Sequence, residues 1–104
     1  MPRNDNDTRE SALSESRAET REPEMYRVLL HNDDYTTMEF VVEILMLVFS
    51  KTAEDATRIM FNVHRKGYGI CGVYTYEIAE TKVETVHSLA RENNFPLKCS
   101  IEEE

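Results

Sequence analysis

Composition changes abruptly at residue 24 of the 104, and every segment able to form a core lies after that point. Residues 1–24 contain four Arg, seven Asp or Glu and only four apolar residues. Such a segment cannot bury enough apolar surface to offset the conformational entropy that is lost on ordering. We therefore expect residues 1–24 to be a disordered N-terminal arm, and residues 25–104 to form one small domain with a single core.

Six segments after the arm have the patterns of regular secondary structure. Short runs rich in strand-forming residues alternate with longer runs whose apolar residues recur at helical spacing. In chain order we predict a strand at 25–30, helices at 37–49 and 52–67, a strand at 70–74, a helix at 75–93 and a strand at 97–101. The order β-α-α-β-α-β predicts an α+β domain in which three helices pack against an antiparallel or mixed three-stranded sheet.

The spacing also predicts how the helices begin and which residues they bury. Thr36 and Glu39 form a capping-box pattern before the first helix, Thr52 and Gly67 bound the second, and Thr75 can cap the third. The predicted core stripes are Ala56, Ile59, Met60 and Val63 on the second helix, and Ala79, Val83, Val86 and Ala90 on the third.

The charge balance narrows the classes of partner. The 12 Lys and Arg are outnumbered by 20 Asp and Glu, which gives a net charge of −8. Nucleic acids and anionic membranes are bound through clustered basic residues, so neither is expected as a partner. No run approaches the roughly 20 apolar residues of a membrane span, and the N-terminal residues do not resemble a signal segment. We expect a cytoplasmic protein whose two cysteines, Cys71 and Cys99, are free thiols.

A polar cluster, Asn32-Asp33-Asp34, separates the first strand from the first helix. One interpretation is structural, because Asn and Asp side chains bond nearby backbone groups in turns. The other is functional: if Thr36 already caps the helix, the cluster has more acceptors than the turn requires. Two carboxylates and an amide oxygen suit a cation with several N–H donors, such as an ammonium group. The sequence leaves both interpretations open.

His64 and three apolar residues are the other candidates for a site. His64 follows Met60 by four residues on the same helix face, and the plainer interpretation makes it a core or boundary residue. Met38, Met60 and Val63 are core residues in that view, although methionine also suits a pocket for varied bulky side chains. Whether the helix brings His64 opposite the polar turn does not follow from the spacing.

A metal site is the rival use of His31, His64 and His87 with Asp33 and Asp34. No two of the histidines are four residues apart, and the sequence has no HExxH or Cys/His grouping. It also has no GxSxG motif and no phosphate-binding loop, so little in it suggests an enzyme. A small hydrolase or metal-binding domain that uses His64, Asp33 and His31 is the leading alternative to a binding protein.

Three segments that together span most of residues 25–104 resemble one protein family. They are MYRVLLHNDDYTTMEFVVEIL, VHRKGYGICGVYTYEIAETKVE and ARENNFPLKCSIE. In this order they are similar to the ClpS family of adaptors, which bind N-degron proteins and deliver them to a Clp ATPase. The family's fold agrees with the predicted order of elements. A ribosome-associated scaffold domain is a further alternative, because the adaptor fold is similar to a domain of the ribosomal stalk protein.

The resemblance implies a binding function with no catalysis, no cofactor and no metal. The substrate's α-amino group is expected to meet Asn32, Asp33 and His64, in a site that includes Asp34. The first side chain (Phe, Leu, Tyr or Trp) is expected to enter a pocket formed by Thr36, Met38, Val41, Met60, Val63 and Leu97. The expected partner is the N-terminal domain of a Clp AAA+ ATPase, ClpA or ClpC, which would meet Glu77, Glu80 and Lys82. The adaptor is expected to be a monomer, and the ClpP protease would degrade the delivered protein.

Two features depart from the family's pattern. Thr37 stands where members often have proline, which pre-sets the first helical turn, so a looser start of this helix is expected. Met46 and Leu47 stand where the family usually has polar residues, which predicts an exposed apolar spot.

Overall fold

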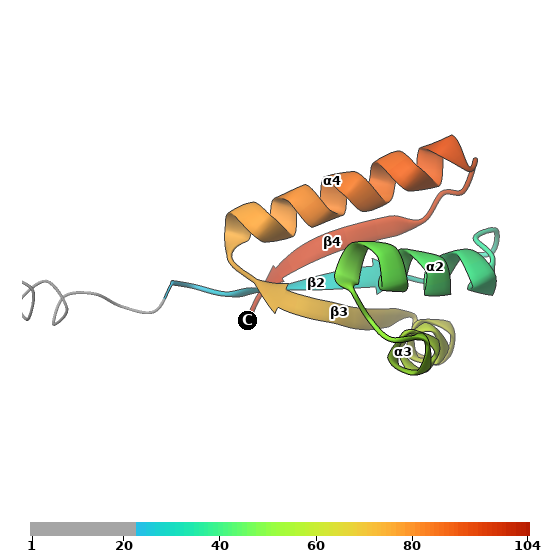
Figure 1. The fold of residues 1–104 in the computed structure, drawn as a ribbon, viewed down its shortest axis with the longest axis horizontal. Helices are drawn as coiled ribbons and strands as arrows, with labels where there is room; N and C mark the ends of the chain where they lie inside the picture. Colours follow the sequence, from blue (N-terminus) through green and yellow to red (C-terminus); the bar gives the residue numbers. More distant parts are fainter. Residues whose placement is uncertain (1–22) are drawn as a thin grey trace, which may run out of the picture.

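The computed structural model describes residues 23–104, and its elements follow one another in the order β-α-α-β-α-β (Figure 1). The strands are β2 (Tyr26–His31), β3 (Tyr68–Tyr74) and β4 (Lys98–Glu103), and the helices are α2 (Met38–Phe49), α3 (Ala53–Lys66) and α4 (Tyr76–Glu92). The predicted α+β class and element order are confirmed. The predicted arm lies outside the described residues, except for Pro23 and Glu24 at its end.

β2 is the central strand of a sheet with the order β3-β2-β4. Both pairings are antiparallel, which decides between the two sheet types that the sequence left open. Val28 and Leu30 of β2 are fully buried and belong to one core cluster with Ile44, Leu45 and Val86. Figure 1 shows α4 running along β4, whereas α3 lies beside β3. The core thus lies between the sheet and the three helices.

The predicted ends of α3 are confirmed. Thr52 caps its start, where the Thr52 hydroxyl accepts a hydrogen bond from Asp55 N at 3.1 Å. Gly67 ends the helix with φ +94°, a left-handed conformation that glycine adopts without steric cost. The predicted core stripe is also confirmed, because all four residues are buried: Ala56, Ile59, Met60 and Val63.

In α4, the predicted core stripe faces the sheet as expected. Ala79, Val86 and Ala90 are buried, and Val83 is partly buried against the core. Thr75 stands at the N-cap position, but its side chain makes no capping hydrogen bond. Packing of the stripe, rather than a side-chain cap, therefore accounts for the position of this helix.

The predicted capping box at the start of α2 is wrong by one residue. Thr37 is the N-cap, and its hydroxyl accepts a hydrogen bond from Phe40 N at 3.1 Å. The N–H and hydroxyl of Thr36 donate to Asp33 instead, so Thr36 neither caps the helix nor closes a box with Glu39. The threonine that replaces proline thus gives this helix a side-chain cap where a looser start was expected.

Both cysteines are buried and free, as predicted. Burial raises the pKa of both thiols, that of Cys99 to about 12. Neither therefore forms the thiolate that nucleophilic chemistry requires near neutral pH.

Two features of the surface bear on the other predictions. Met46 and Leu47 are 42% and 69% exposed, which confirms the predicted apolar spot. Within residues 23–104, no helix has the length and apolar character needed to cross a membrane.

Candidate functional site

A cavity of about 250 Å³ lies between the turn after β2 and the second half of α3. Nine of the ten residues predicted to bind substrate line it: Asn32, Asp33, Asp34, Thr36, Met38, Val41, Met60, Val63 and His64. The tenth, Leu97, is only 3% exposed and packs in the core, outside this lining. The structure therefore places a polar turn, a histidine and an apolar surface around one opening.

The position of His64 opposite the turn follows from the way α3 leads into β3. Gly67 turns the chain from α3 directly into β3, where Tyr68 pairs with His31 at the end of β2. Asn32, the first residue after β2, donates its backbone N–H to the Gly67 carbonyl at 2.9 Å. The end of α3 is thereby held beside the polar turn, and His64 lies in its last turn.

Glycine at position 69 lets α3 pack close against β3. A Cβ on Gly69 would lie 2.7 Å from Val63 Cγ2 and 3.1 Å from the carbonyl oxygen of Ile59. A larger residue would therefore push α3 away from the sheet, because interiors are close-packed and the obstructing groups include backbone. Since α3 carries Met60, Val63 and His64, the shape of the cavity depends on this contact.

The Asp33 carboxylate is already engaged by its own turn. Its Oδ1 accepts hydrogen bonds from Tyr35 N at 2.8 Å and from Thr36 N at 2.7 Å, and its Oδ2 accepts one from the Thr36 hydroxyl at 2.8 Å. Burial acts to raise the pKa of this carboxyl, but the bonds from Thr36 and Tyr35 outweigh it and hold the pKa below its ordinary value. Asp33 is thus charged at neutral pH and shapes the turn itself, as the structural interpretation of this cluster expected.

Three polar side chains at the opening make no such bonds with the residues that the structure describes. Asn32, Asp34 and His64 are exposed and line the cavity. Within residues 23–104, no hydrogen bond or ion pair joins their side chains to another residue. An amide oxygen, a carboxylate and an imidazole nitrogen together can accept three N–H donors, and an ammonium group has three.

The rest of the cavity wall is apolar. Val41, Met60 and Val63 are between 3% and 7% exposed and belong to the core cluster. Met38, at the start of α2, is 45% exposed. The flexible, polarisable side chain of Met38 thus lies at the exposed edge of the cavity, and buried core residues form the wall behind it.

The other two histidines lie away from this cavity and bond elsewhere. His31 Nε2 lies 2.6 Å from the Ser100 hydroxyl, and His87 Nε2 accepts the backbone N–H of Cys99 at 3.0 Å. In the part of the chain from residue 23 onward, no group of three or more His, Cys, Asp and Glu side chains is placed to hold a metal ion. The three histidines of the metal-binding alternative therefore do not meet at one site, and only His64 lies with Asp33 and Asp34.

Comparison with known proteins adds to this geometry. The family model described as ATP-dependent Clp protease adaptor protein ClpS matches residues 21–100. The chain belongs to the ClpS family. A ClpS adapter protein from Desulfatibacillum aliphaticivorans is 62% identical over 92 residues, which are 88% of this chain and 88% of that relative. One from Lawsonia intracellularis is 68% identical over 83 residues, which are 80% of this chain and 76% of that relative.

A solved ClpS structure has the same fold. It is Agrobacterium tumefaciens ClpS2 bound to L-phenylalaninamide, which is 40% identical to this chain and has a TM-score of 0.77. The match covers 80% of this chain and 100% of that one. The predicted family is confirmed, and with it the role of the family as adaptors of the ATP-dependent Clp protease.

The three residues expected to meet the ATPase differ in their surroundings in this ClpS family member. Glu77 and Glu80 are exposed on α4, whereas Lys82 is partly buried. Lys82 Nζ donates to the Val48 carbonyl at 2.8 Å and lies 5.8 Å from the centre of the Phe49 ring. Because α2 has no basic residue in its last turn, Lys82 supplies the positive charge that favours a helix C-terminus. This tie between α4 and α2 depends on tertiary contacts, so sequence spacing could not reveal it.

Proposed function

We propose that this ClpS family member binds the free α-amino group and the bulky first side chain of N-degron proteins and delivers them to the Clp protease. The observation that carries the proposal is the cavity, in which acceptors that have no partner among residues 23–104 stand directly beside an apolar wall. The ligand of the related ClpS2, L-phenylalaninamide, has a free α-amino group and a phenyl side chain, which fit these two halves.

In this proposal, Asn32, Asp34 and His64 accept hydrogen bonds from the α-ammonium group. An α-amino group is largely protonated near pH 7, and a hydrogen bond to a charged group contributes about 1.5–3 kcal/mol. Asp33 adds negative charge and holds the turn in shape, since both of its oxygens already accept bonds from Tyr35 and Thr36. Asp34 accepts no such bonds from residues 23–104, so we assign the direct contact with the amine to its carboxylate, whereas the family resemblance pointed to Asp33.

The first side chain enters the apolar part of the cavity, beside Thr36, Val41, Met60 and Val63, with Met38 at the entrance. Burying a Phe or Leu side chain contributes about 1.5–3 kcal/mol. Together with the amine contacts, and after the costs of association, binding of about −8 kcal/mol results, which is micromolar. Neither half suffices alone, so the site requires a free N-terminus and a bulky residue at once.

Delivery uses a different surface. Glu77 and Glu80 on α4 dock on the N-terminal domain of a Clp AAA+ ATPase, ClpA or ClpC, and ClpP degrades the substrate. Lys82 contributes by holding α4 against the end of α2. The adaptor itself performs no chemistry, and it acts as a cytoplasmic monomer.

Binding of labelled peptides that differ only in their first residue tests the proposal. Peptides that begin with Phe, Leu, Tyr or Trp should bind in fluorescence anisotropy, and those that begin with Gly or Glu should not. His64→Ala should weaken the Phe peptide by about 1.5–3 kcal/mol and leave the melting temperature unchanged. Arg65→Ala, on the same exposed turn of α3, is the matched control and should bind normally. Equal affinity for all first residues would contradict the proposal.

A further inference from the structure

A second groove lies on the side of α3 away from the candidate site, and its charge is opposite to that of the whole chain. Three basic side chains line it, Lys51 before α3 and Arg58 and Lys66 on it, and none of the acidic residues among 23–104 does. The net charge of the protein is −8, so this concentration of positive charge does not follow from composition. The groove is about 330 Å³ in volume.

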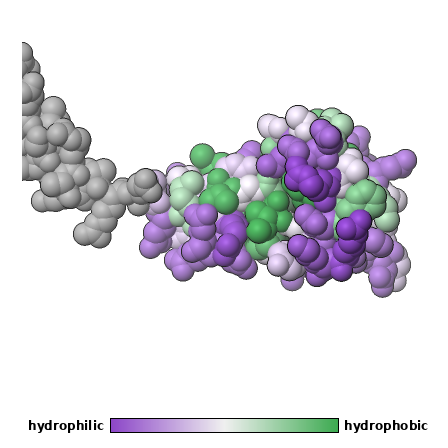
Figure 2. Space-filling view, turned by 90° about the horizontal axis from the view of Figure 1, so that it is seen from below, coloured by the Kyte–Doolittle hydropathy of each residue, from purple (hydrophilic) through white to green (hydrophobic). Residues whose placement is uncertain are grey.

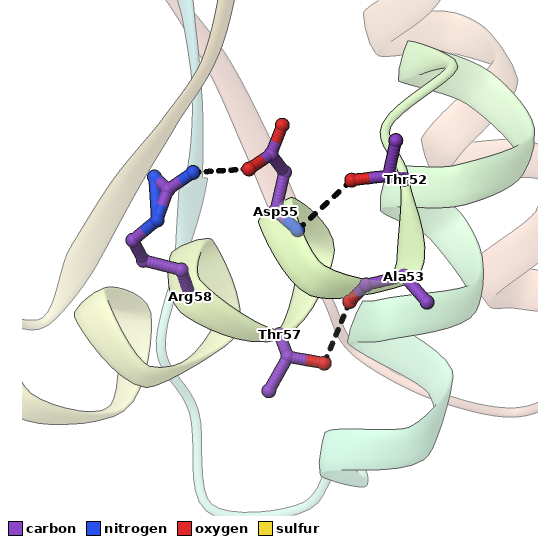
Figure 3. A network of polar contacts seen from close by, with 5 residues as sticks. All are labelled: Thr52, Ala53, Asp55, Thr57 and Arg58. Atoms are coloured by element: carbon purple, nitrogen blue, oxygen red, sulfur yellow. Dashed lines mark hydrogen bonds and ion pairs between the residues drawn. The ribbon is translucent and has the colours of Figure 1, made fainter.

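One of the three basic side chains is held in place by a local network. Figure 3 shows Arg58 paired with the Asp55 carboxylate, while Asp55 N donates to the Thr52 hydroxyl at 3.1 Å. The same turn is tied by a bond from the Thr57 hydroxyl to the Ala53 carbonyl at 2.8 Å. Since a guanidinium has five donors, the pairing orients Arg58 and leaves donors for a second carboxylate.

The opposite wall of the groove is the end of an edge strand. β3 pairs only with β2, so among residues 23–104 its outer edge has no partner strand. Gly69 faces α3, while Tyr68 and Ile70 are 46% and 44% exposed. β3 and α3 are the lowest elements in Figure 1, and Figure 2 views the molecule from that side: hydrophobic residues gather near the middle, with hydrophilic ones around them. The edge thus combines free backbone groups, exposed apolar side chains and nearby positive charge.

We propose that this groove binds an extended acidic segment of a partner protein, which adds to the outer edge of β3 as a fourth strand. Side chains of an added strand alternate between its two faces. One row would lie on the α3 side, where acidic residues meet Lys51, Arg58 and Lys66. The other row would lie beside Tyr68 and Ile70, where apolar residues fit. The partner segment is therefore one in which Asp or Glu alternates with apolar residues.

Basic residues near a free edge also have a simpler use, because they discourage edge-to-edge aggregation. The two accounts differ in what they predict for a soluble acidic peptide. We would use a short peptide of alternating Glu and Val, acetylated at its N-terminus so that it cannot use the amine site. A C-terminal fluorophore reports binding to the full-length protein by anisotropy.

Saturable binding is expected, and Lys51→Glu with Lys66→Glu should weaken it by about tenfold or more, as like charges replace opposite ones. The matched control is Arg91→Glu with Lys98→Glu, which changes the net charge equally but lies on α4 and β4. It should weaken binding by no more than about twofold. Circular dichroism would verify that both double variants are folded. N-methylation of alternate peptide amides on the side facing β3 should abolish binding, because it removes the strand pairing.

Three results would overturn the proposal. The first is no saturable binding to the unaltered protein, which leaves edge protection as the role of these charges. The second is an equal loss in the two double variants, which means that only net charge matters. The third is unchanged binding of the N-methylated peptide, which excludes strand addition.

Discussion

Replacing Asp33 or Asp34 by alanine should separate the structural carboxylate from the one that binds substrate. Asp33 accepts three bonds from its turn, of which the two from Thr36 are partly buried and the one from Tyr35 is exposed. At about 1 kcal/mol for each of the two partly buried bonds, Asp33→Ala should cost about 2 kcal/mol of stability. For a domain of this size, that lowers the melting temperature by roughly 8–16 °C.

Asp34→Ala should reduce peptide affinity with little effect on stability. Its side chain is exposed, so the free energy of unfolding should change by no more than about 0.5 kcal/mol. The affinity for a Phe-starting peptide should nevertheless fall by about 1.5–3 kcal/mol, roughly ten- to hundredfold, because one charge-assisted bond to the amine is lost.

Thermal unfolding and peptide anisotropy on the same preparations measure both quantities. The pH dependence is a further check on Asp33, because the pKa of its carboxyl is lower in the folded than in the unfolded state. The contribution of this carboxyl to the free energy of unfolding is then fully present above its pKa in the unfolded state. It is lost as the pH falls through its pKa in the folded state. The difference in stability between wild type and Asp33→Ala should therefore shrink in acid. An unchanged melting temperature in Asp33→Ala, or full peptide affinity in Asp34→Ala, would refute this division of roles.

Three other changes test separate parts of the structure. Met38→Ala should bind peptides that begin with Ile or Val, whose branched Cβ crowds the entrance in the wild type, and should still bind Phe peptides. Continued rejection of Ile and Val peptides in anisotropy would show that Met38 does not exclude them. Gly69→Ala should lower both the melting temperature and the peptide affinity, because a Cβ would lie 2.7 Å from a side chain of α3. A variant with the melting temperature and peptide affinity of the wild type would disprove the close packing. Burial, helped by neighbouring positive charges, lowers the pKa of His87, so stability should decline as the pH falls below about 6.5. His87→Gln, which keeps an acceptor for Cys99 N, should flatten that decline in denaturant titrations, and an identical slope would count against the assignment.

The elements could be predicted where the local pattern and the packing agree. The Thr52 cap, the buried stripe of α3 and the Gly67 stop all depend on residues within a few positions of one another, and the structure confirms each of them. The prediction at the start of α2 was wrong because both Thr36 and Thr37 can cap a helix. The Thr36 hydroxyl and N–H both donate to Asp33, which leaves Thr37 as the cap. Helix propensities do not describe this contact.

The candidate site could be predicted as a set of residues but not as a geometry. Helical spacing places Met60, Val63 and His64 on one face of α3, and residue type marks the turn as polar. The bond from Asn32 N to the Gly67 carbonyl, which holds the end of α3 beside that turn, joins residues far apart in sequence. Spacing within one element carries no information on such a contact. The expectation that His64 meets the polar turn therefore came from the family resemblance.

The contribution of the free α-amino group tests the central claim most directly. A Phe-starting peptide would be compared with the same peptide acetylated at its N-terminus, by anisotropy at neutral pH. Acetylation removes the charge and leaves the phenyl ring intact, so any difference reports the contacts of Asn32, Asp34 and His64. The account predicts that the acetylated peptide binds more weakly by about 3 kcal/mol, which is more than a hundredfold. Equal binding of the two peptides would contradict it.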